Sequence, residues 1–391
     1  MSRNIAVGID IGTYQVKVVV TETKDGKPPR IIGAGMAESK GLRHGYILNS
    51  ADVTKSIRSA VAQAEKTSGI KIKKSYLALG GVGLQSITQS SSIIISRADS
   101  EVTDLDISKV SDACERDIPK QSIVNRKIIH SIPLHYKIDG RTVLGRPQGM
   151  KGTKLEAKTL FITCIEQHLN DIIDALNDAH IEVLDVVTAP LAASIVTLTK
   201  TQKLAGCVLA NIGAETVSIV VFEDNLPISL EVFPIGSTDI TNDIALGLRV
   251  PLEEAETIKR GDPNNSNHSR KKLDEIVVAR LSDIFELIEA HLKKIDKNGL
   301  LPAGIIITGG GSGIATIEDM AKATLKLPSR VASLGGNARD GVKDATWAVA
   351  YGLCLFGLSE GGEDISGISR VKTGTGKIIE WSKKLIKQLL P

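Results

Sequence analysis

The chain carries one short pattern twice, and this internal duplication constrains its fold more than any other feature. "NIAVGIDIGTYQVKVVV" occupies residues 4–20, and "GCVLANIGAETVSIVV" occupies residues 206–221. Each copy is an apolar run, a polar turn built on Ile-Gly and a second run rich in Val and Ile, which predicts a β-hairpin. The copies align without a gap, with Asp10 on Asn211 and Gly12 on Gly213. Two such hairpins in one chain predict two lobes of similar design.

Composition agrees with a soluble, two-lobed protein. The 391 residues exceed what one compact core usually holds, and 42% hydrophobic with 24% charged residues is a globular balance. The cysteines are scattered without metal or redox spacing, which predicts small apolar residues in a reducing compartment: Cys114, Cys164, Cys207 and Cys354. Asp10 interrupts the first apolar run, and we find no signal peptide and no membrane-spanning stretch. We therefore expect a cytoplasmic protein.

The net charge of +3 comes from the end of the chain. From residue 377 onward, four lysines face one acidic residue, Glu380, so the other residues sum to zero. Aromatic residues make up only 3% of the chain, which leaves few side chains to stack on bases. We expect no nucleic-acid partner.

Strand and helix patterns alternate along most of the chain, which predicts an α/β architecture. The expected elements are a hairpin over 5–20, strands over 31–36 and 75–80, a helix over 51–67, a helix-strand-helix unit over 166–203, a second hairpin from 207, a helical region over 240–298, and a strand running into a glycine loop over 304–314. Residues 84–163 do not follow this alternating pattern and contain a polar strand and a helix over 106–116. They are expected to form a small inserted α+β module.

The hairpin turns have the chemistry of a phosphate site. A glycine at a turn lets backbone N–H groups converge on an anion, and a neighbouring Asp holds Mg²⁺ through its water shell. Asp10 is the expected metal residue, and Lys17 adds positive charge. The expected phosphate-binding residues are Asp10, Gly12, Thr13, Tyr14, Lys17, Gly213, Ala214, Glu215 and Thr216. The glycine loop and one helical pair are expected to bind adenosine, through Gly309, Gly310, Gly311, Ser312, Glu256 and Lys259.

The order of these motifs resembles the superfamily of actins, sugar kinases and heat-shock-chaperone ATPases. "GIDIGTYQVKVVV" resembles the first phosphate loop, "TAPLAAS" at 188–194 a connecting helix, "ANIGAETVSIVV" the second phosphate loop and "TGGGSGI" the adenosine loop. Within it the chain resembles the FtsA family of bacterial actin-like cell-division proteins, through "IPLHYKIDG", "GRPQGMKGTKLEAK", "GSTDITNDIALGLRVPLEEAETIKRG" and the terminal "GKIIEWSKKLIKQLLP". The resemblance covers essentially the whole chain.

The resemblance implies an α/β, actin-like two-lobed ATPase fold with a small α+β subdomain inserted in the first lobe. The expected divisions are a first lobe core of 1–83 with 164–203 and 345–358, the inserted subdomain at 84–163, a second lobe core of 204–235 and 303–344, its small subdomain at 236–302, a linker at 359–376 and an amphipathic membrane-targeting helix at 377–391. It also implies ATP and Mg²⁺ as cofactors, polymerisation with copies of itself, and other division proteins bound by the inserted subdomain.

The resemblance further implies that the protein tethers FtsZ to the membrane. It implies a location at the division septum, on the cytoplasmic face of the membrane. Arg280 resembles the family's contact to the C-terminal peptide of FtsZ. The terminal segment places apolar residues on one helical face and lysines beside it, as a peripheral anchor to anionic lipid does. The expected membrane residues are Ile378, Ile379, Trp381, Leu385, Ile386, Leu389, Lys383, Lys384 and Lys387.

The second loop departs from the family pattern. FtsA proteins usually carry Asp-Ile-Gly-Gly-Gly-Thr, whereas this chain has Asn211 and Glu215 within "NIGAET". An Asn side chain accepts a hydrogen bond from a metal-bound water, but it brings no negative charge and takes no proton from an attacking water. Ala189 likewise stands where the chaperone ATPases carry a carboxylate. We therefore expect ATP binding with slow or absent hydrolysis, and name no catalytic residue.

Two alternatives remain open from the residues. The first is a type IV pilus assembly protein of the PilM kind, which shares the core but has no need of a terminal membrane helix. The second is a sugar or acid kinase on the same fold, which needs a carboxylate base between the lobes. A coupled phosphotransfer assay over a sugar panel separates the kinase from the other two.

Overall fold

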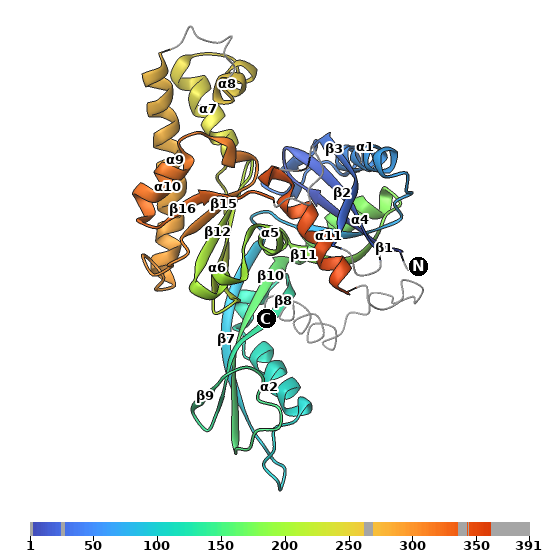
Figure 1. Ribbon diagram of the computed structural model, residues 1–391, viewed down its shortest axis with the longest axis vertical. Helices are drawn as coiled ribbons and strands as arrows, with labels where there is room; N and C mark the ends of the chain where they lie inside the picture. Colours follow the sequence, from blue (N-terminus) through green and yellow to red (C-terminus); the bar gives the residue numbers. More distant parts are fainter. Residues whose placement is uncertain (1–2, 25–27, 262–268, 335–341, 343, 361–391) are drawn as a thin grey trace.

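The computed structural model describes residues 3–24, 28–261, 269–334, 342 and 344–360 of the chain. Figure 1 shows an elongated molecule whose two lobes lie side by side, with a narrow module extending from one end and a group of helices at the other. The actin-like, two-lobed α/β fold expected from the sequence is confirmed. The linker and terminal helix expected at 359–391 fall almost wholly outside the described residues.

The first lobe is built on five strands: β1 (Arg3–Ile11), β2 (Gln15–Lys24), β3 (Arg30–Glu38), β6 (Lys74–Leu79) and β11 (Glu182–Thr188). They form one sheet in the order β11-β6-β1-β2-β3, in which β1, β2 and β3 are antiparallel and β6 and β11 run parallel to β1. Its helices are α1 (Ser50–Ser68), α4 (Glu166–Asp178), α5 (Ala189–Thr197) and α11 (Ala348–Glu360), whereas α6 (Lys200–Ala205) packs on the second lobe.

Strand β2 shows why this sheet is stable. Its residues are buried almost without interruption, and Val16, Val18 and Val20 have no exposed surface. A strand buried on both faces needs cover on both faces, and α1 and α11 both pack against β2. Helix α1 begins at the capping side chain of Asn49 and ends at Gly69, whose φ of 71° suits glycine.

The second lobe repeats the first. Its strands are β12 (Cys207–Ile212), β13 (Val217–Glu223), β14 (Leu226–Phe233), β15 (Ile305–Thr308) and β16 (Ser329–Val331), in the order β14-β13-β12-β15-β16. Read from β3, the first sheet has the same sequence of three antiparallel and two parallel strands. The duplication seen in the hairpins therefore extends to both five-stranded sheets. Helix α10 (Ile317–Leu325) and the short turn η2 (Gly310–Gly313) complete this side, whereas the turn η3 (Ala345–Trp347) leads into α11 and packs with it.

The inserted module is a separate four-stranded sheet. Its elements are β7 (Leu84–Ile94), β8 (Arg126–Ile138), β9 (Arg141–Val143), β10 (Lys154–Ile165), α2 (Asp104–Arg116) and α3 (Lys120–Ile123), with the strand order β7-β10-β8-β9. The expected helix over 106–116 begins two residues earlier, because Thr103 and Asp106 form a capping box. The Ser86 hydroxyl donates to the Leu230 carbonyl at 2.7 Å and accepts from its N–H at 3.0 Å, which joins the module to the second lobe.

Three helices form the small subdomain of the second lobe: α7 (Ser237–Leu248), α8 (Leu252–Lys259) and α9 (Arg270–Lys294). They account for the predicted helical region; in Figure 1, α7 and α8 lie at the upper end of the molecule, and α9 runs from there down the side of the second lobe, next to α10. Among the described residues, buried apolar side chains form one cluster in the inserted module, one in the second lobe, and a larger one that continues from the first lobe onto second-lobe strands through residues such as Leu209 and Phe222. The two-stranded ribbon of β4 (Leu42–Arg43) and β5 (Tyr46–Ile47) lies in the first lobe.

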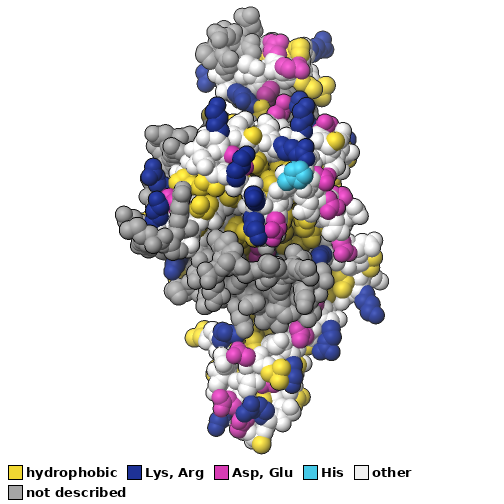
Figure 2. All heavy atoms as spheres, turned by 90° about the vertical axis from the view of Figure 1, so that its right-hand side faces the viewer, with side chains coloured by type: hydrophobic (Ala, Val, Ile, Leu, Met, Phe, Trp, Pro, Cys, Tyr) yellow, Lys and Arg dark blue, Asp and Glu magenta, His cyan; other side chains and the backbone are white. Residues whose placement is uncertain are grey.

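All four cysteines are buried and free, as their scatter predicted. Within the described ranges, no helix combines the length and apolar character that crossing a membrane requires. On the face shown in Figure 2, basic and acidic side chains both occur along the length of the molecule.

Candidate functional site

A cavity of about 810 Å³ lies between the two lobes, and both hairpins border it. A volume of this size is typical of sites for small molecules and cofactors. Most of the residues expected from the sequence line it: Asp10, Gly12, Thr13, Tyr14, Lys17, Gly213, Ala214, Thr216, Glu256, Lys259, Gly309, Gly310 and Gly311. Glu215 and Ser312 are not among the lining residues. Ala189, at the start of α5, also borders the cavity.

The turn of the first hairpin is closed by a hydrogen bond from the Gly12 N–H to the Gln15 carbonyl, at 3.1 Å. Asp10 and Lys17 lie opposite each other across β1 and β2. Burial raises the pKa of Asp10 to about 6, although Lys17 opposes this shift. Burial lowers the pKa of Lys17, while Asp10 and Asp344 counteract it. This hairpin therefore brings two opposite charges to the cavity.

The second hairpin has the same turn without the charges. The Gly213 N–H donates to the Thr216 carbonyl at 2.8 Å, and Asn211 lies opposite Ser218. Gly309 approaches the second hairpin so closely that a Cβ there would lie 2.4 Å from the Asn211 Oδ1. Its φ of 91° also favours glycine. The glycine loop is thus fixed directly against the second hairpin.

The glycine loop follows β15 as the sequence predicted. It forms the turn η2, and the Ser312 hydroxyl donates to the Gly309 carbonyl at 2.7 Å. This bond holds Ser312 within the loop, which explains why its side chain is not part of the cavity wall. The glycines present only backbone to the cavity, so a flat group is able to approach closely.

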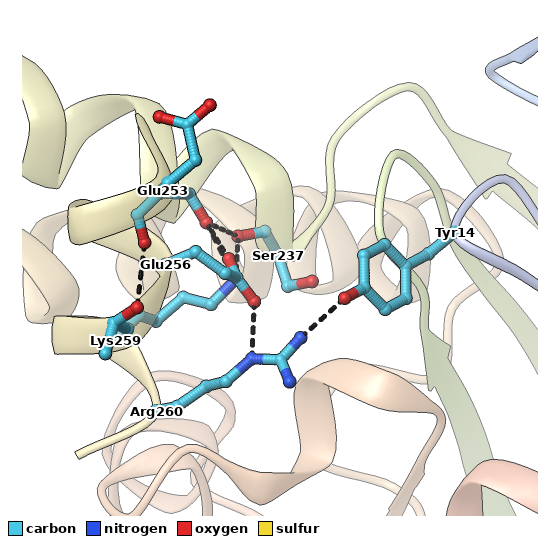
Figure 3. A network of polar contacts seen from close by, with 8 residues as sticks. Tyr14, Ser237, Glu253, Glu256, Lys259 and Arg260 are labelled. Atoms are coloured by element: carbon cyan, nitrogen blue, oxygen red, sulfur yellow. Dashed lines mark hydrogen bonds and ion pairs between the residues drawn. The ribbon is translucent and has the colours of Figure 1, made fainter. Parts of the chain in front are cut away.

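Glu256 and Lys259 belong to a network at the other side of the cavity (Figure 3). Glu256 accepts from Lys259 and the Thr241 hydroxyl at 2.6 Å and from Arg260 at 2.9 Å. Burial opposes ionisation of Glu256, but the hydrogen bonds from Lys259, Thr241 and Arg260 lower its pKa overall. A carboxylate held ionised in this way offers a fixed acceptor to a ligand hydroxyl.

Each hairpin turn makes a side-chain contact across the cleft. Arg260 donates to the Tyr14 hydroxyl at 2.8 Å, and Figure 3 shows the guanidinium between Glu256 and the tyrosine. On the other hairpin, Glu215 accepts from the backbone N–H of His44 at 2.5 Å. The Nδ1 atom of His44 lies 3.1 Å from the Glu215 backbone oxygen, so it completes a second bond when it carries the proton. Glu215 thus points to the first lobe instead of into the cavity.

The sequence reasoning missed many of the lining residues, among them Arg260 and Thr241 of the network above and two further groups. Ser237 and Thr238 lie in the first turn of α7 and border the cavity, while their backbone N–H groups donate to the Gly213 and Ala214 carbonyls at 2.9 and 2.8 Å. The "GSTD" pattern, which caps this helix through Asp239, was the available signal. Asp344 and Thr346 also line the cavity, and the Lys17 ammonium donates to the Thr346 carbonyl at 2.8 Å. No local motif marks that segment.

The site suits Mg²⁺ held through water. Across the described residues, no three His, Cys, Asp or Glu side chains gather as a metal cluster. Asp10 supplies one carboxylate at the cavity wall, and Mg²⁺ commonly keeps several waters while binding one or two carboxylates and phosphate oxygens. Asp10 is therefore the residue that would orient a hydrated ion.

Arg280 lies in α9, away from the cavity wall. It makes two bonds to Asp243, at 2.6 and 3.0 Å, and lies 3.2 Å from Asp283. Its side chain is 29% exposed, so it is less open than a free surface arginine. Any partner that uses Arg280 must share it with these two carboxylates. The expected membrane residues from Ile378 onward lie outside the described part of the chain.

Two family profiles match the chain. The profile described as "Cell division protein FtsA" matches residues 208–352, and that described as "SHS2 domain inserted in FTSA" matches residues 81–163. The second match coincides with the inserted four-stranded sheet.

Curated relatives match over nearly the full length. Proteins named "Cell division protein FtsA" are 30% identical in Pseudomonas aeruginosa, covering 93% of this chain and 92% of the relative, and 29% identical in Bacillus subtilis, covering 91% and 84%. The relative in Borreliella burgdorferi is 28% identical, covering 91% of both chains.

Solved structures show the same fold at lower identity. A PilM-PilN type IV pilus biogenesis complex aligns with a TM-score of 0.67 and 17% identity, over 90% of this chain and 98% of that one. MreB5 of Spiroplasma citri bound to ADP aligns with a TM-score of 0.51 and 12% identity, over 90% and 96%. At these identities the likeness concerns the fold alone, so it gives the pilus alternative no functional support.

Proposed function

The chain belongs to the FtsA family of cell division proteins, and from this premise we propose that it binds ATP with Mg²⁺ between its lobes, polymerises, and tethers FtsZ filaments to the membrane. It is an actin-like division protein, with relatives aligned over most of its length. The proposed place of action is the cytoplasmic face of the membrane at the division septum.

The observation that carries the nucleotide proposal is the cavity flanked by both hairpins. The turns of the two hairpins, Lys17, and Ser237 and Thr238 of α7 line the cavity, and we propose that phosphates are held there. Glu256 and the glycine loop border the same cavity and would hold the nucleoside. The related fold of MreB5 has been solved with ADP bound, which supports a nucleotide as the ligand.

Nucleotide is proposed to act as a switch of lobe geometry, with slow turnover. Asn211 has no negative charge and accepts no proton, so the second hairpin offers no general base at that position. Ala189 offers none either. Asp10 remains as the carboxylate that would orient Mg²⁺. The phosphates of the bound nucleotide would supply further ligands to the ion.

Calorimetry of the whole chain with ATP and Mg²⁺ tests this proposal. We expect saturable binding of one nucleotide and phosphate release close to the buffer rate. Absence of any heat of binding, together with absence of protection by ATP in thermal melting, would overturn the nucleotide claim. Phosphate transfer to a member of a sugar panel would favour the kinase alternative instead.

We propose that α9 takes part in binding the C-terminal peptide of FtsZ, with Arg280 at the contact. An arginine already shared by Asp243 and Asp283 reaches a peptide carboxylate only by partial exchange, so its contribution should be moderate. Arg280→Glu is expected to weaken peptide binding roughly tenfold. Lys272→Glu, an exposed charge reversal on the same helix, is the matched control. Equal affinity in both variants would refute the assignment.

The terminal segment is proposed to fasten the protein to anionic lipid. Each lysine near the surface contributes about 1 kcal/mol, and burial of the apolar face adds to it. One copy should therefore bind reversibly, and a polymer should bind firmly by summing many anchors. Deletion of 377–391, or Leu385→Asp, is expected to abolish co-sedimentation with anionic vesicles, whereas Leu385→Met should retain it. Vesicle binding by the truncated chain would rule out this anchor.

Filament formation and membrane attachment can be observed together. Electron microscopy of the full chain with ATP on an anionic lipid monolayer should show filaments lying on the lipid. The same chain on a zwitterionic monolayer should leave filaments in solution. Filaments that attach equally to both lipids would contradict the proposed electrostatic part of the anchor.

A further inference from the structure

Equivalent positions of the two duplicated hairpins reach across the cleft in opposite directions. Residue 14 in the first copy aligns with residue 215 in the second, on the register that places Asp10 on Asn211. Tyr14 extends from the first lobe to Arg260 of the second, and Glu215 extends from the second lobe to His44 of the first. Each lobe therefore gives one turn residue to the other.

The Tyr14 contact is held in place on the side of the second lobe. The Arg260 guanidinium donates to the tyrosine hydroxyl at 2.8 Å and lies 5.7 Å from the centre of the ring. Its Nε atom is bound to Glu256, which itself is fixed by Lys259 and Thr241. An arginine anchored in this way presents its remaining donors in a set direction.

The Glu215 contact is held in place on the side of the first lobe. His44 has a φ of 50°, and the next residue, Gly45, packs so closely on Gly81 that a Cβ would lie 2.5 Å from the Gly81 Cα. The His44 carbonyl also accepts from the Val82 N–H at 3.2 Å. The backbone N–H of His44 that donates to Glu215 is thus part of a rigid loop.

Both contacts flank the cavity, and both connect the turn of a β-hairpin to the opposite lobe. Separation of the lobes would break both contacts, because the His44 donor is a backbone N–H and the Arg260 guanidinium is bound to Glu256 on its own lobe. Glu215 is not among the residues that line the cavity, so a ligand could enter without displacing its carboxylate.

We infer that Tyr14 and Glu215 form a reciprocal latch, in which each hairpin turn holds the opposite lobe and the pair keeps the cleft closed. Both are positioning residues: they fix the two turns relative to each other and touch no reacting atom. The inference rests on the proposed nucleotide binding only for its second readout, the rate at which nucleotide leaves.

The first readout is the distance between the lobes of the full chain without nucleotide. The four native cysteines are buried, so the exposed positions Ser59 and Ala279 can be changed to Cys and spin-labelled selectively. The labels then report the separation of α1 from α9 by pulsed electron resonance. The parent is expected to show one narrow distance. Glu215→Gly combined with Tyr14→Phe should give a longer and broader one.

Matched variants separate the latch from general damage. Glu223→Gly removes a carboxylate that pairs with Lys297 inside the second lobe, and it should leave the distance unchanged. Glu215→Gln should also stay near the parent, because its amide oxygen still accepts the His44 N–H. Opening by Glu215→Gln as large as by Glu215→Gly would overturn the hydrogen bond as the cause. An unchanged distance in the folded double variant would overturn the latch itself.

The second readout is nucleotide release from the unlabelled variants. The double variant should release a fluorescent ATP analogue about tenfold faster than the parent, while Glu223→Gly releases it at the parent rate. If the parent binds no analogue, the nucleotide proposal fails and the distance measurement still decides the latch. Faster release with an unchanged lobe distance would contradict the latch.

Discussion

The two hairpins at the cleft share one backbone and differ in charge. Residues 10 and 17 face each other across β1 and β2, as residues 211 and 218 do across β12 and β13. The first pair is Asp10 and Lys17, and the second is Asn211 and Ser218. Since the strand registers correspond, the two charges have been exchanged for neutral groups without any shift in pairing.

The difference shows that turn geometry and side-chain chemistry are separable. A carboxylate at 211, a partly buried position, would have no lysine opposite it, whereas the neutral pair leaves no charge without a partner. Gly12 and Gly213 make the same turn bond in both hairpins. The backbone that would grip phosphate is therefore kept twice, whereas the ionisable groups are kept once.

Blocking either turn should have the largest effect. Gly12→Arg and Gly213→Arg each place a long charged side chain where the turn meets the cavity. If both turns grip phosphate, each substitution should lower ATP affinity more than a hundredfold in calorimetry, with the fold retained by circular dichroism. Normal binding by one of the two variants would show that only the other hairpin holds the nucleotide.

Making the first hairpin resemble the second tests its charge pair. Lys17→Ser leaves Asp10 without its cation and removes the bond to Thr346, so it should lower the free energy of unfolding by about 2 kcal/mol. Asp10→Asn added to Lys17→Ser should cost less than Lys17→Ser alone, because no charge is then left unpaired. Lys24→Ser, on the exposed end of the same strand, is the control for denaturant unfolding. Additive losses in the double variant would contradict the pairing.

Making the second hairpin resemble the first tests its missing carboxylate. Asn211→Asp should raise ATP turnover about tenfold, below the 10²–10⁴ of a fully positioned general base, because the position has no lysine opposite. Phosphate release measures the rate, and Ser218→Ala is the control for a change in the same pair. An unaltered rate would place the limit on hydrolysis elsewhere in the cleft.

Lowering the pH should distinguish the first hairpin, which has Asp10, from the second, which has Asn211. We expect this effect to be smaller than those above. The pKa of Asp10 is raised from 3.8 to about 6 in the folded protein, so its protonation stabilises the fold below pH 3.8, and this gain is lost as the pH rises through about 6. Binding of Mg²⁺ with nucleotide follows the opposite sign, since it needs the charged carboxylate. Affinity should fall up to about tenfold between pH 7 and pH 5.

The Asp10→Asn variant corrects that titration for protons taken up by the nucleotide itself. Its affinity should follow only the nucleotide's own pH dependence. Parallel curves for the two proteins, measured by calorimetry in the presence of Mg²⁺, would show that Asp10 does not contribute to metal binding.

The sequence was sufficient for the parts of the site that are local. The two hairpins and the glycine loop are continuous segments, so periodicity and turn residues were enough to predict them. All three border the cavity, as expected from the sequence. The cross-cleft bonds were not predictable in this way. His44 lies 171 residues from Glu215, and Tyr14 lies 246 residues from Arg260. Only the folded arrangement of the lobes brings such loops together, which is why Glu215 was expected among the phosphate-binding residues.

Helix α11 belongs to the first lobe although it comes last in the described chain. It packs on β1 and β2, where the Cys354 thiol donates to the Val19 carbonyl across 335 residues of sequence. At a ribosomal rate of roughly 5–20 residues per second, β2 therefore waits about 20 to 70 s for its final cover. The last strand of the second lobe, β16, is synthesised just before α11, so the second lobe is complete slightly before the first. The first lobe to be synthesised is thus the last to mature, and its uncovered valine-rich strand is the surface a nascent-chain chaperone would have to shield.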